Sequence, residues 1–331
     1  MTNYLFITKV MTFFCAISLF SCSDQAVFKS ESLTALSHSE VVTEASAISK
    51  DGRFHLVASE HAVCLWDQTQ VESPPHCLKG YQAEYIELVD ISENNQFYLT
   101  SNHVAVHLYS LVTHQLVGSW QIANDIINDL DISADGNKIL LGLRTGQAVI
   151  IEVSSNKTTT FAQHRLTINS VSLSDDGNIA FTGSSDKKAL LWHTETGENI
   201  HEFSHRSRVN HVSISSDGTK GFSLAAIKSR IFWDLTTGEK LAELGTSVRY
   251  FQFNDTRFSD DNSLLLTASP KQMIKLWRVM DGELLASWQS KITIGRASVL
   301  GVAFVDQDKI ATSNSDGLYE QWPLPPIDNK N

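Results

Sequence analysis

A short motif recurs seven times along this chain at almost constant spacing. Each copy begins with a large apolar residue and continues into Asp, Asn or Gly residues that favour a tight turn. The copies are ISKDGRF from Ile48, ISENNQF from Ile91, ISADGNK from Ile132, LSDDGNI from Leu173, ISSDGTK from Ile214, FSDDNSL from Phe258 and FVDQDKI from Phe304. Successive copies are 43, 41, 41, 41, 44 and 46 residues apart. Repeats of this length are typical of folds in which neighbouring units bury one another's apolar faces.

Each unit is predicted to contain four short strands. Asp-Gly, Asn-Asn or Asp-Asn pairs separate two runs of alternating polarity, which indicates a β-hairpin because the turn needs residues that tolerate positive φ. A third run ends at Trp66, Tyr109, Glu152, Trp192, Trp233, Trp277 and Trp322 in the successive copies. A Thr-Gly-Glu or Asp-Gly-Glu turn, as at Thr196, Thr237 and Asp281, then leads into a fourth run.

A repeat of this length, with four strands, a turn Asp and a Trp that ends the third strand, resembles the WD-repeat family. The resemblance covers residues 27–324 and implies an all-β fold, a seven-bladed β-propeller of four-stranded antiparallel blades. The seventh copy stops after its third run at Leu324, whereas Val27 to Leu36 is a strand-like run ahead of the first blade. We therefore expect this N-terminal strand to complete the last blade and close the ring. Residues 325–331 would form a polar tail.

The first 21 residues have the pattern of a secretory signal peptide. Lys9 precedes an apolar run from Val10 to Phe20, which is too short to span a bilayer. The run ends in Leu-Phe-Ser-Cys22, which resembles a bacterial lipobox. The resemblance implies cleavage before Cys22, lipidation of that residue and a short tether over residues 22–26. Ser23 then implies export to the outer membrane, facing the periplasm. An ordinary signal peptide followed by an unrelated cysteine is the alternative.

Two cysteines remain within the predicted blades, Cys64 and Cys77. Both are expected on neighbouring strands of the first blade. A periplasmic location permits a disulfide between them. Two buried free thiols are the other interpretation.

Charge and motifs argue against nucleic-acid binding and catalysis. The formal charge of −11 disfavours contact with a phosphate backbone. The sequence has no GxSxG, GxGxxG or P-loop motif. His103 and His107 would lie roughly 13 Å apart on one strand, which is too far for a shared metal ion. We predict a non-catalytic protein without a cofactor or a metal site.

In WD-repeat proteins a His, a Ser or Thr, an Asp and the Trp form a hydrogen-bonded set inside a blade. The resemblance assigns this structural set in the fourth blade to His164, Thr182, Asp186 and Trp192. The fifth blade has His205, Ser223 and Trp233 but carries Ile227 at the Asp position. The spacing of these residues matches a blade and not a Ser-His-Asp hydrolase.

By analogy with known propellers, the turns between strands two and three lie at the same end of the ring as the links between blades. Basic residues are frequent in these segments, and our candidates for partner binding are Arg165, Lys187, Arg206, Arg208, Lys228 and Arg230. Acidic turn residues are frequent at the other end. A cationic face of this kind would attract a protein or a glycan with an acidic surface. The alternative is that these are solvated loop residues.

The predicted function is that of a monomeric scaffold, tethered by lipid to the periplasmic side of a bacterial membrane, that binds envelope proteins through its loop faces. The alternative is a propeller that binds or processes a small ligand in its central channel. The fold alone does not choose between them, because propellers host many unrelated functions.

Overall fold

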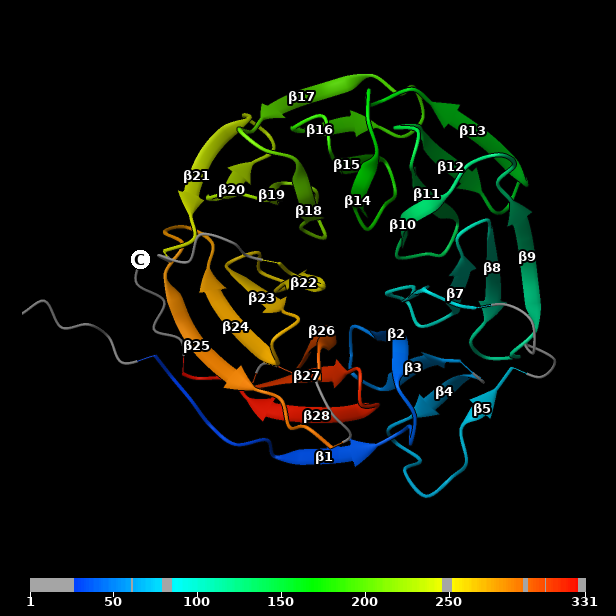
Figure 1. Ribbon diagram of the computed structural model, residues 1–331, viewed down its shortest axis with the longest axis vertical. Coiled ribbons are helices and arrows are strands. Elements are labelled where there is room, and N and C mark those ends of the chain that lie inside the picture. Colours follow the sequence, from blue (N-terminus) through cyan, green and yellow to red (C-terminus); the bar gives the residue numbers. More distant parts are fainter. Residues whose placement is uncertain are drawn as a thin grey trace, which may run out of the picture.

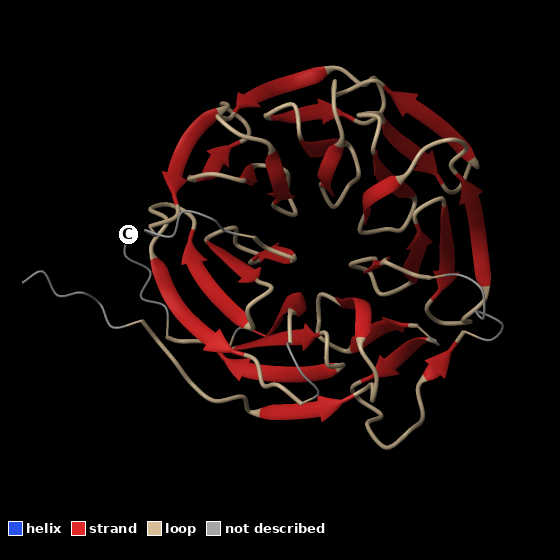
Figure 2. Cartoon of the chain, viewed as in Figure 1, coloured by secondary structure: helices blue, strands red, loops and turns tan. Residues whose placement is uncertain are grey.

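Seven four-stranded antiparallel sheets are arranged as blades around a common axis (Figures 1 and 2). The computed structural model describes residues 27–60, 62–78, 85–245, 252–293, 297–306 and 308–326. These residues form strands, turns and loops without a helix, so none of them belongs to a helix that could cross a membrane. The predicted all-β, seven-bladed propeller is confirmed.

The first three blades follow one another along the chain, each running from the inner strand to the outer strand. Blade one contains β2 (Thr43–Ile48), β3 (Phe54–Ser59), β4 (Val63–Asp67) and β5 (His76–Cys77). Blade two contains β6 (Leu88–Ile91), β7 (Phe97–Asn102), β8 (Ala105–Ser110) and β9 (Leu116–Gln121). Blade three contains β10 (Ile127–Ile132), β11 (Lys138–Leu143), β12 (Ala148–Glu152) and β13 (Lys157–Phe161).

The next three blades repeat this order. Blade four contains β14 (Ile168–Leu173), β15 (Ile179–Ser184), β16 (Lys188–His193) and β17 (Asn199–Ser204). Blade five contains β18 (Val209–Ile214), β19 (Lys220–Ala225), β20 (Ser229–Asp234) and β21 (Glu239–Glu243). Blade six contains β22 (Asp255–Phe258), β23 (Leu264–Ala268), β24 (Met273–Arg278) and β25 (Leu284–Gln289).

Blade seven is built from strands near both ends of the described chain. Its inner strands are β26 (Val299–Asp306), β27 (Lys309–Asn314) and β28 (Leu318–Pro323), and its outer strand is β1 (Thr34–Ser37), which pairs antiparallel with β28. The N-terminal strand is shorter than the expected run from Val27 to Leu36. Its first part lies instead on blade six, where Phe28 forms a parallel bridge with Ala286 of β25.

The recurring motif forms the turn between the first and second strands of a blade. In blade one the Ser49 hydroxyl donates to the Asp51 carboxylate (2.6 Å) and accepts from the Phe54 N–H (2.9 Å). Gly52 then adopts a φ of 70°, a conformation that costs a glycine little. Asn95 and Asn262 take the same place in blades two and six with φ of 56° and 58°. The predicted positive-φ turn is therefore present.

The hydrophobic core is distributed between adjacent blades rather than gathered at one centre. Gly183 on β15 illustrates how closely the blades approach. A Cβ atom at this position would lie 2.7 Å from Val209 and 2.8 Å from Val212 of the next blade. Gly142 has the same relation to Ile168 and Val171 of blade four. Small residues at this place in the second strand allow the next inner strand to pack against it.

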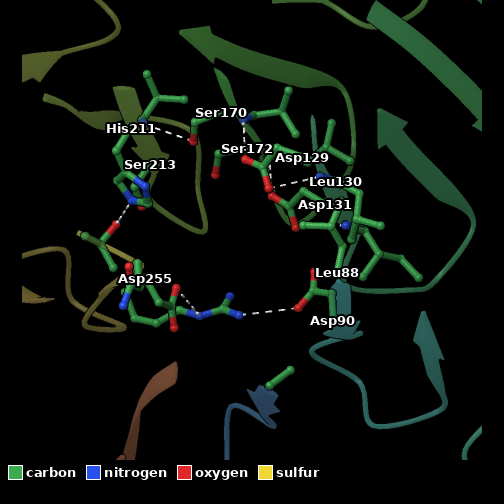
Figure 3. Close-up of a pocket in the computed structure, with 18 of the residues that line it drawn as sticks. Leu88, Asp90, Asp129, Leu130, Asp131, Ser170, Ser172, His211, Ser213 and Asp255 are labelled. Carbon is green, nitrogen blue, oxygen red and sulfur yellow. Dashed lines mark hydrogen bonds and ion pairs between the residues drawn. The ribbon is translucent and has the colours of Figure 1, made fainter. Parts of the chain in front are cut away.

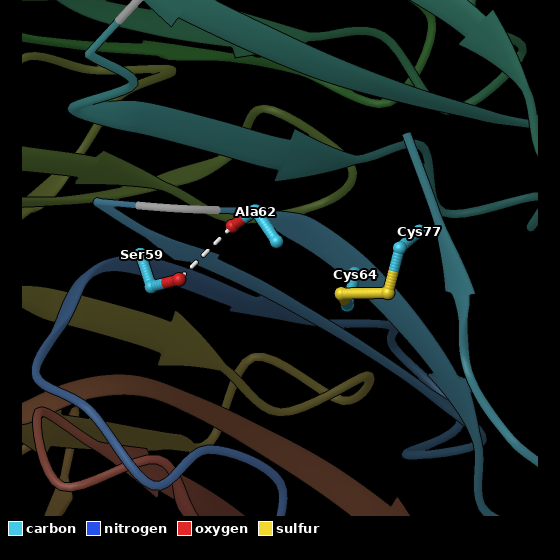
Figure 4. The surroundings of a disulfide bond; sticks show 4 residues. All are labelled: Ser59, Ala62, Cys64 and Cys77. Atoms are coloured by element: carbon cyan, nitrogen blue, oxygen red, sulfur yellow. Dashed lines mark hydrogen bonds between the residues drawn. A yellow bond between two sulfur atoms is a disulfide. The ribbon is translucent and has the colours of Figure 1, made fainter. Parts of the chain in front are cut away.

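A disulfide joins Cys64 on β4 to Cys77 on β5 (Figure 4). The two residues are direct partners across the antiparallel pair, and their Cα atoms are 4.1 Å apart. Of the two interpretations that the sequence left open, the structure contains the disulfide. It holds the shortest strand of the ring onto its neighbour.

Candidate functional site

A cavity of about 430 Å³ lies along the axis of the ring and is lined mainly by the inner strands of blades one to six. Figure 3 shows part of this lining. Its ionisable side chains are mostly acidic and include Glu44, Glu87, Asp90, Glu93, Asp129, Asp131, Asp175 and Asp255, together with His211 and Arg257. This central channel is the first candidate site.

Three of the channel carboxylates bind backbone groups of the neighbouring blade. Asp129 accepts from the Val171 N–H (2.8 Å) and Asp131 from the Leu173 N–H (2.7 Å). Asp255 accepts in the same way from Val302 (2.9 Å). Each inner strand is the edge of its sheet, so these N–H groups have no strand partner on the channel side. The carboxylates therefore satisfy buried donors and connect successive blades.

Serine hydroxyls take over this role between blades four and five. Ser170 accepts from the Val212 N–H and Ser172 from the Ile214 N–H, both at 3.2 Å. A second set of contacts comes from asparagine side chains one residue before these positions. The Asn169 amide donates to the Val209 carbonyl (2.7 Å). Asn128 and Asn254 donate in the same way to the first residue of the next inner strand.

An ion pair crosses the channel from blade six to blade two. The Arg257 guanidinium lies 3.4 Å from the Asp90 carboxylate and 4.0 Å from that of Asp255. Burial opposes the charge of Arg257, but the surrounding carboxylates outweigh it and raise the Arg257 pKa. Burial also raises the pKa of Asp90, and burial together with the Asp90 charge raises the pKa of Asp131. The pKa of Asp129 rises to about 7, chiefly through burial.

The chemistry of the channel is that of a connected polar lining. Burial lowers the pKa of His211 to about 4, so its imidazole is neutral at pH 7, and its Nε2 is paired with the Thr256 hydroxyl (2.8 Å). Within the part of the chain that the structure describes, no group of three His, Cys, Asp or Glu residues is placed to hold a metal ion. Asp129, Asp131 and Asp255, together with the Ser170 and Ser172 hydroxyls, accept hydrogen bonds from the next blade and so connect blades.

Lys50 lies at one mouth of the channel, in the turn that follows β2. Its Nζ is 2.7 Å from Glu93 and 3.2 Å from Asp260, and it is 3.9 Å from Asp175. These acids belong to blades two, six and four, so a single ammonium group contacts three sides of the ring. Burial and the neighbouring Glu93 raise the Asp175 pKa to about 6. Lys50 thus narrows this end of the channel.

The four residues of the WD-type set lie in one hydrogen-bonded chain in blade four. His164 contacts Asp186 through Nδ1 (3.0 Å) and the Thr182 hydroxyl through Nε2 (2.9 Å). The Trp192 indole N–H donates to the same hydroxyl (3.2 Å). Burial lowers the His164 pKa, although Asp186 opposes this shift. All four are buried or nearly so, and they connect the link before β14 to the second and third strands.

Blade five builds the same chain with a different fourth member. His205 contacts the Ser223 hydroxyl (3.1 Å), which accepts from the Trp233 N–H (2.7 Å). The Nδ1 of His205 is paired with Ser229 (2.8 Å), two residues beyond Ile227. Sequence reasoning missed Ser229 because it looked for an acid at the position of Ile227.

Backbone hydrogen bonds place the candidate basic loops at one end of the ring. The His205 N–H donates to the Lys187 carbonyl (2.8 Å), and the Ala226 N–H donates to the Arg208 carbonyl (2.9 Å). The side chains that reach the surface here belong to Arg165, Lys187, Arg206, Arg208 and Lys228. We call these five residues the cationic face.

Arg230 does not belong to the cationic face, and its assignment as a partner-binding residue is wrong. It lies within β20, where it is paired with Leu224 and only 3 % exposed. Alternate residues of a strand point to the same side, so Arg230 shares a side with the buried Phe232. Burial also lowers the pKa of Arg230.

Exposed apolar side chains accompany the cationic face. Leu166, next to Arg165, is 54 % exposed, and Ile227, next to Lys228, is 42 % exposed. Apolar groups surrounded by polar ones are typical of protein-binding surfaces. Sequence reasoning selected only the charges and missed these two residues, although both lie in the same short loops.

The channel network was also missed, and its signal is visible in the sequence. The inner strands of blades three to six read INDLDIS, INSVSLS, VNHVSIS and FNDTRFS, which share an Asn at the second place. Polar residues then recur at the third and fifth places in all four.

Cys22 and the predicted signal and tether, residues 1–26, lie outside the described residues, as does most of the polar tail.

A family model for the WD domain, G-beta repeat, matches residues 155–193. This segment runs from the turn before β13 to the end of β16 and contains the complete set of His164, Thr182, Asp186 and Trp192. The match and the seven-bladed ring support the WD-repeat propeller family. No curated protein matches the chain. A WD-repeat propeller suggests a protein-interaction scaffold.

Proposed function

We propose that this protein is a non-catalytic scaffold, tethered by lipid to the periplasmic side of a bacterial outer membrane, that binds envelope proteins through its cationic face. The observation that carries the proposal is the cationic face itself, where exposed basic and apolar side chains lie together at one end of a rigid ring. The polar groups of the channel already serve to connect blades, which favours a binding role over catalysis. The propeller is proposed to act as a monomer.

The envelope location is supported by two independent features. The lipobox-like sequence ending at Cys22 carries the proposed lipid. The disulfide between Cys64 and Cys77 supports an oxidising compartment, since such bonds are rare in the reducing cytosol. Labelling cells with radioactive palmitate tests the tether. Label should enter the wild-type protein and not a Cys22→Ala variant, and an unlabelled wild-type protein would remove the membrane part of the proposal.

The partner is proposed to be a protein with an acidic surface. Opposite charges steer association and select partners, and their effect falls as salt screens them. Replacing Arg165, Arg206 and Arg208 by Glu should therefore abolish capture of the partner by cross-linking in living cells, followed by mass spectrometry. The matched control replaces Lys157, Lys240 and Lys309, which lie away from this face, by Glu and makes the same change in net charge. Equal capture by both variants would contradict the proposed face.

A second candidate function rests on the channel. Its volume of about 430 Å³ is in the range of small-molecule sites. A ligand that binds only the native state raises the melting temperature, and the rise grows with the logarithm of the ratio of ligand concentration to its Kd. A reproducible thermal shift with a small molecule, lost when Asn169 or Asn254 is replaced by Leu, would favour this function over the scaffold.

A further inference from the structure

The outer strands of blades two and six have almost the same sequence. β9 reads LVGSWQ from Leu116 to Gln121, and β25 reads LLASWQ from Leu284 to Gln289. They also pair with their inner neighbours in the same register, including the irregularity after the first residue. In both blades the Trp is the fifth residue of the strand.

The edge of β25 is occupied by a segment of this chain. The Phe28 N–H donates to the Leu285 carbonyl (3.1 Å), and the Ser287 N–H donates to the Phe28 carbonyl (2.9 Å). The Phe28 ring lies edge-on to Trp288, with 6.4 Å between ring centres. The Trp288 side chain, which contacts this ring, is only 2 % exposed.

The equivalent edge of β9 has no such cover among the described residues, where β9 is the last strand of its sheet. Leu116 is 54 % exposed and Val117 is 48 % exposed, whereas both corresponding leucines of β25 are partly buried. Trp120 is also more exposed than Trp288. By the shared register, the Val117 carbonyl and the Ser119 N–H point outward, as those of Leu285 and Ser287 do.

Other outer strands carry features that discourage pairing with another chain. β13, β17 and β21 contain charged residues, at Lys157, at Glu202, and at Glu239, Lys240 and Glu243. β5 has two residues and follows two prolines, and β1 has four residues. β9 is six residues long and has neither a charge nor a proline. It is the least protected of the outer edges that the structure describes.

We propose that the outer edge of β9 binds an extended segment of a partner protein, which joins blade two as a fifth strand. The segment presents an aromatic residue beside Trp120, with its N–H directed to the Val117 carbonyl and its carbonyl to the Ser119 N–H. The hydrogen bonds and the ring contact that Phe28 makes with β25 are the pattern for the proposed segment. Main-chain hydrogen bonds supply affinity in such strand addition, and the side-chain contact supplies specificity. This edge is separate from the cationic face.

The test uses the full-length protein and a fluorescent peptide with the sequence Val-Phe-Lys-Ser-Glu, which is that of residues 27–31. Saturable binding, measured by anisotropy, should slow hydrogen exchange at the Ser119 amide. Ser119→Pro removes the outward donor and should weaken binding about tenfold or more, as should a peptide methylated at the Phe nitrogen. Thr159→Pro, at the corresponding place in β13, is the matched control and should bind as the wild type does.

Absence of binding, or binding that Ser119→Pro leaves unchanged, would overturn the proposal. Slower exchange in β25 instead of β9 would also overturn it, because the peptide would then have displaced the chain's own segment. Concentration-dependent dimers in sedimentation, lost in Val117→Lys, would identify a second copy as the occupant and exclude the proposed one. Melting temperatures confirm that each variant is folded. These variants leave the cationic face intact. A negative result in the peptide-binding test therefore does not contradict the scaffold proposal.

Discussion

The carboxylate of Asp131 on β10 accepts a hydrogen bond of 2.7 Å from the backbone N–H of Leu173 on β14, and it thereby joins blade three to blade four. One blade later, Ser172 accepts from Ile214 in the same way (3.2 Å). Such bonds give the inner edge of each sheet the partners that a neighbouring strand would otherwise provide. The polar residues around the channel are thus part of the scaffold's construction.

Removing one of these acceptors should destabilise the ring measurably. Ser172→Ala leaves the Ile214 N–H without its acceptor and changes no charge, so the free energy of unfolding should fall by about 1–2 kcal/mol. Urea denaturation measures the effect. Ser155→Ala, in an exposed turn, is the control and should change stability little. Equal stability of the two variants would show that this N–H is satisfied in another way.

Stability should depend on pH through Asp129. Its pKa is about 7 in the folded protein, against an ordinary value of 3.8. The native state therefore keeps this proton at pH values where the unfolded chain has lost it, and stability falls as the pH rises between these two values. Asp129→Asn is always neutral, so its melting temperature should drop less between pH 5 and pH 8 than that of the wild type.

His211 changes stability with pH in the direction opposite to Asp129, and it is present in both the wild type and the Asp129→Asn variant. Its folded pKa of about 4 lies below the ordinary 6.5, so its contribution to stability is present above pH 6.5 and is lost as the pH falls toward 4. The difference between wild type and Asp129→Asn therefore isolates the carboxyl group. Identical pH profiles would mean that Asp129 titrates at an ordinary pKa.

The hydrogen-bonded sets of blades four and five differ in the partner of the histidine Nδ1, which is Asp186 for His164 and Ser229 for His205. Exchanging one partner for the other tests whether they are equivalent. Asp186→Ile copies blade five in blade four and removes the partner of His164, which should cost about 1–3 kcal/mol. Lys188 corresponds to Ser229 of blade five, by the register of the second and third strands. Adding Lys188→Ser to Asp186→Ile should therefore recover part of the loss in thermal denaturation. A double variant no more stable than the single one would show that Ser229 does not replace the acid.

Local patterns predicted most of the fold. The Ser-x-Asp-Gly turn carries its own hydrogen bonds, as at Ser49 and Asp51, so its place in a blade could be recognised from sequence. The aromatic residue at the end of the third strand was an equally local signal. The channel network could not be derived in this way, because Asp131 and Leu173 are 42 residues apart and meet only after the ring has formed.

The errors at the candidate site have a similar cause. Arg230 was assigned to a loop, but β20 begins at Ser229, so strand alternation turns the arginine inward. The run from Val27 to Leu36 was expected to pair with the last blade alone. In the structure Phe28 contacts blade six, and Thr34 begins the pairing with blade seven. In each case the shift of a boundary by a few residues changed which neighbour a side chain meets.

The disulfide should matter most for blade one. β5 pairs with β4 through only two residue pairs, Cys64 with Cys77 and Leu65 with His76. Pro74 and Pro75 precede β5 and have no N–H to extend the ladder. The cross-link therefore compensates for a strand that hydrogen bonds alone hold weakly. Replacing both cysteines by Ser should lower stability by about 2–4 kcal/mol.

The effect should also be local. The Leu78 N–H donates to the Val63 carbonyl (2.9 Å), so its exchange with solvent reports whether the outer segment stays on β4. In the double Ser variant this amide should exchange faster, while amides of β15 and β19 in blades four and five keep their protection. Wild-type protein treated with a reductant should reproduce the result. Unchanged exchange at Leu78 would show that packing, and not the disulfide, fixes the outer strand of blade one.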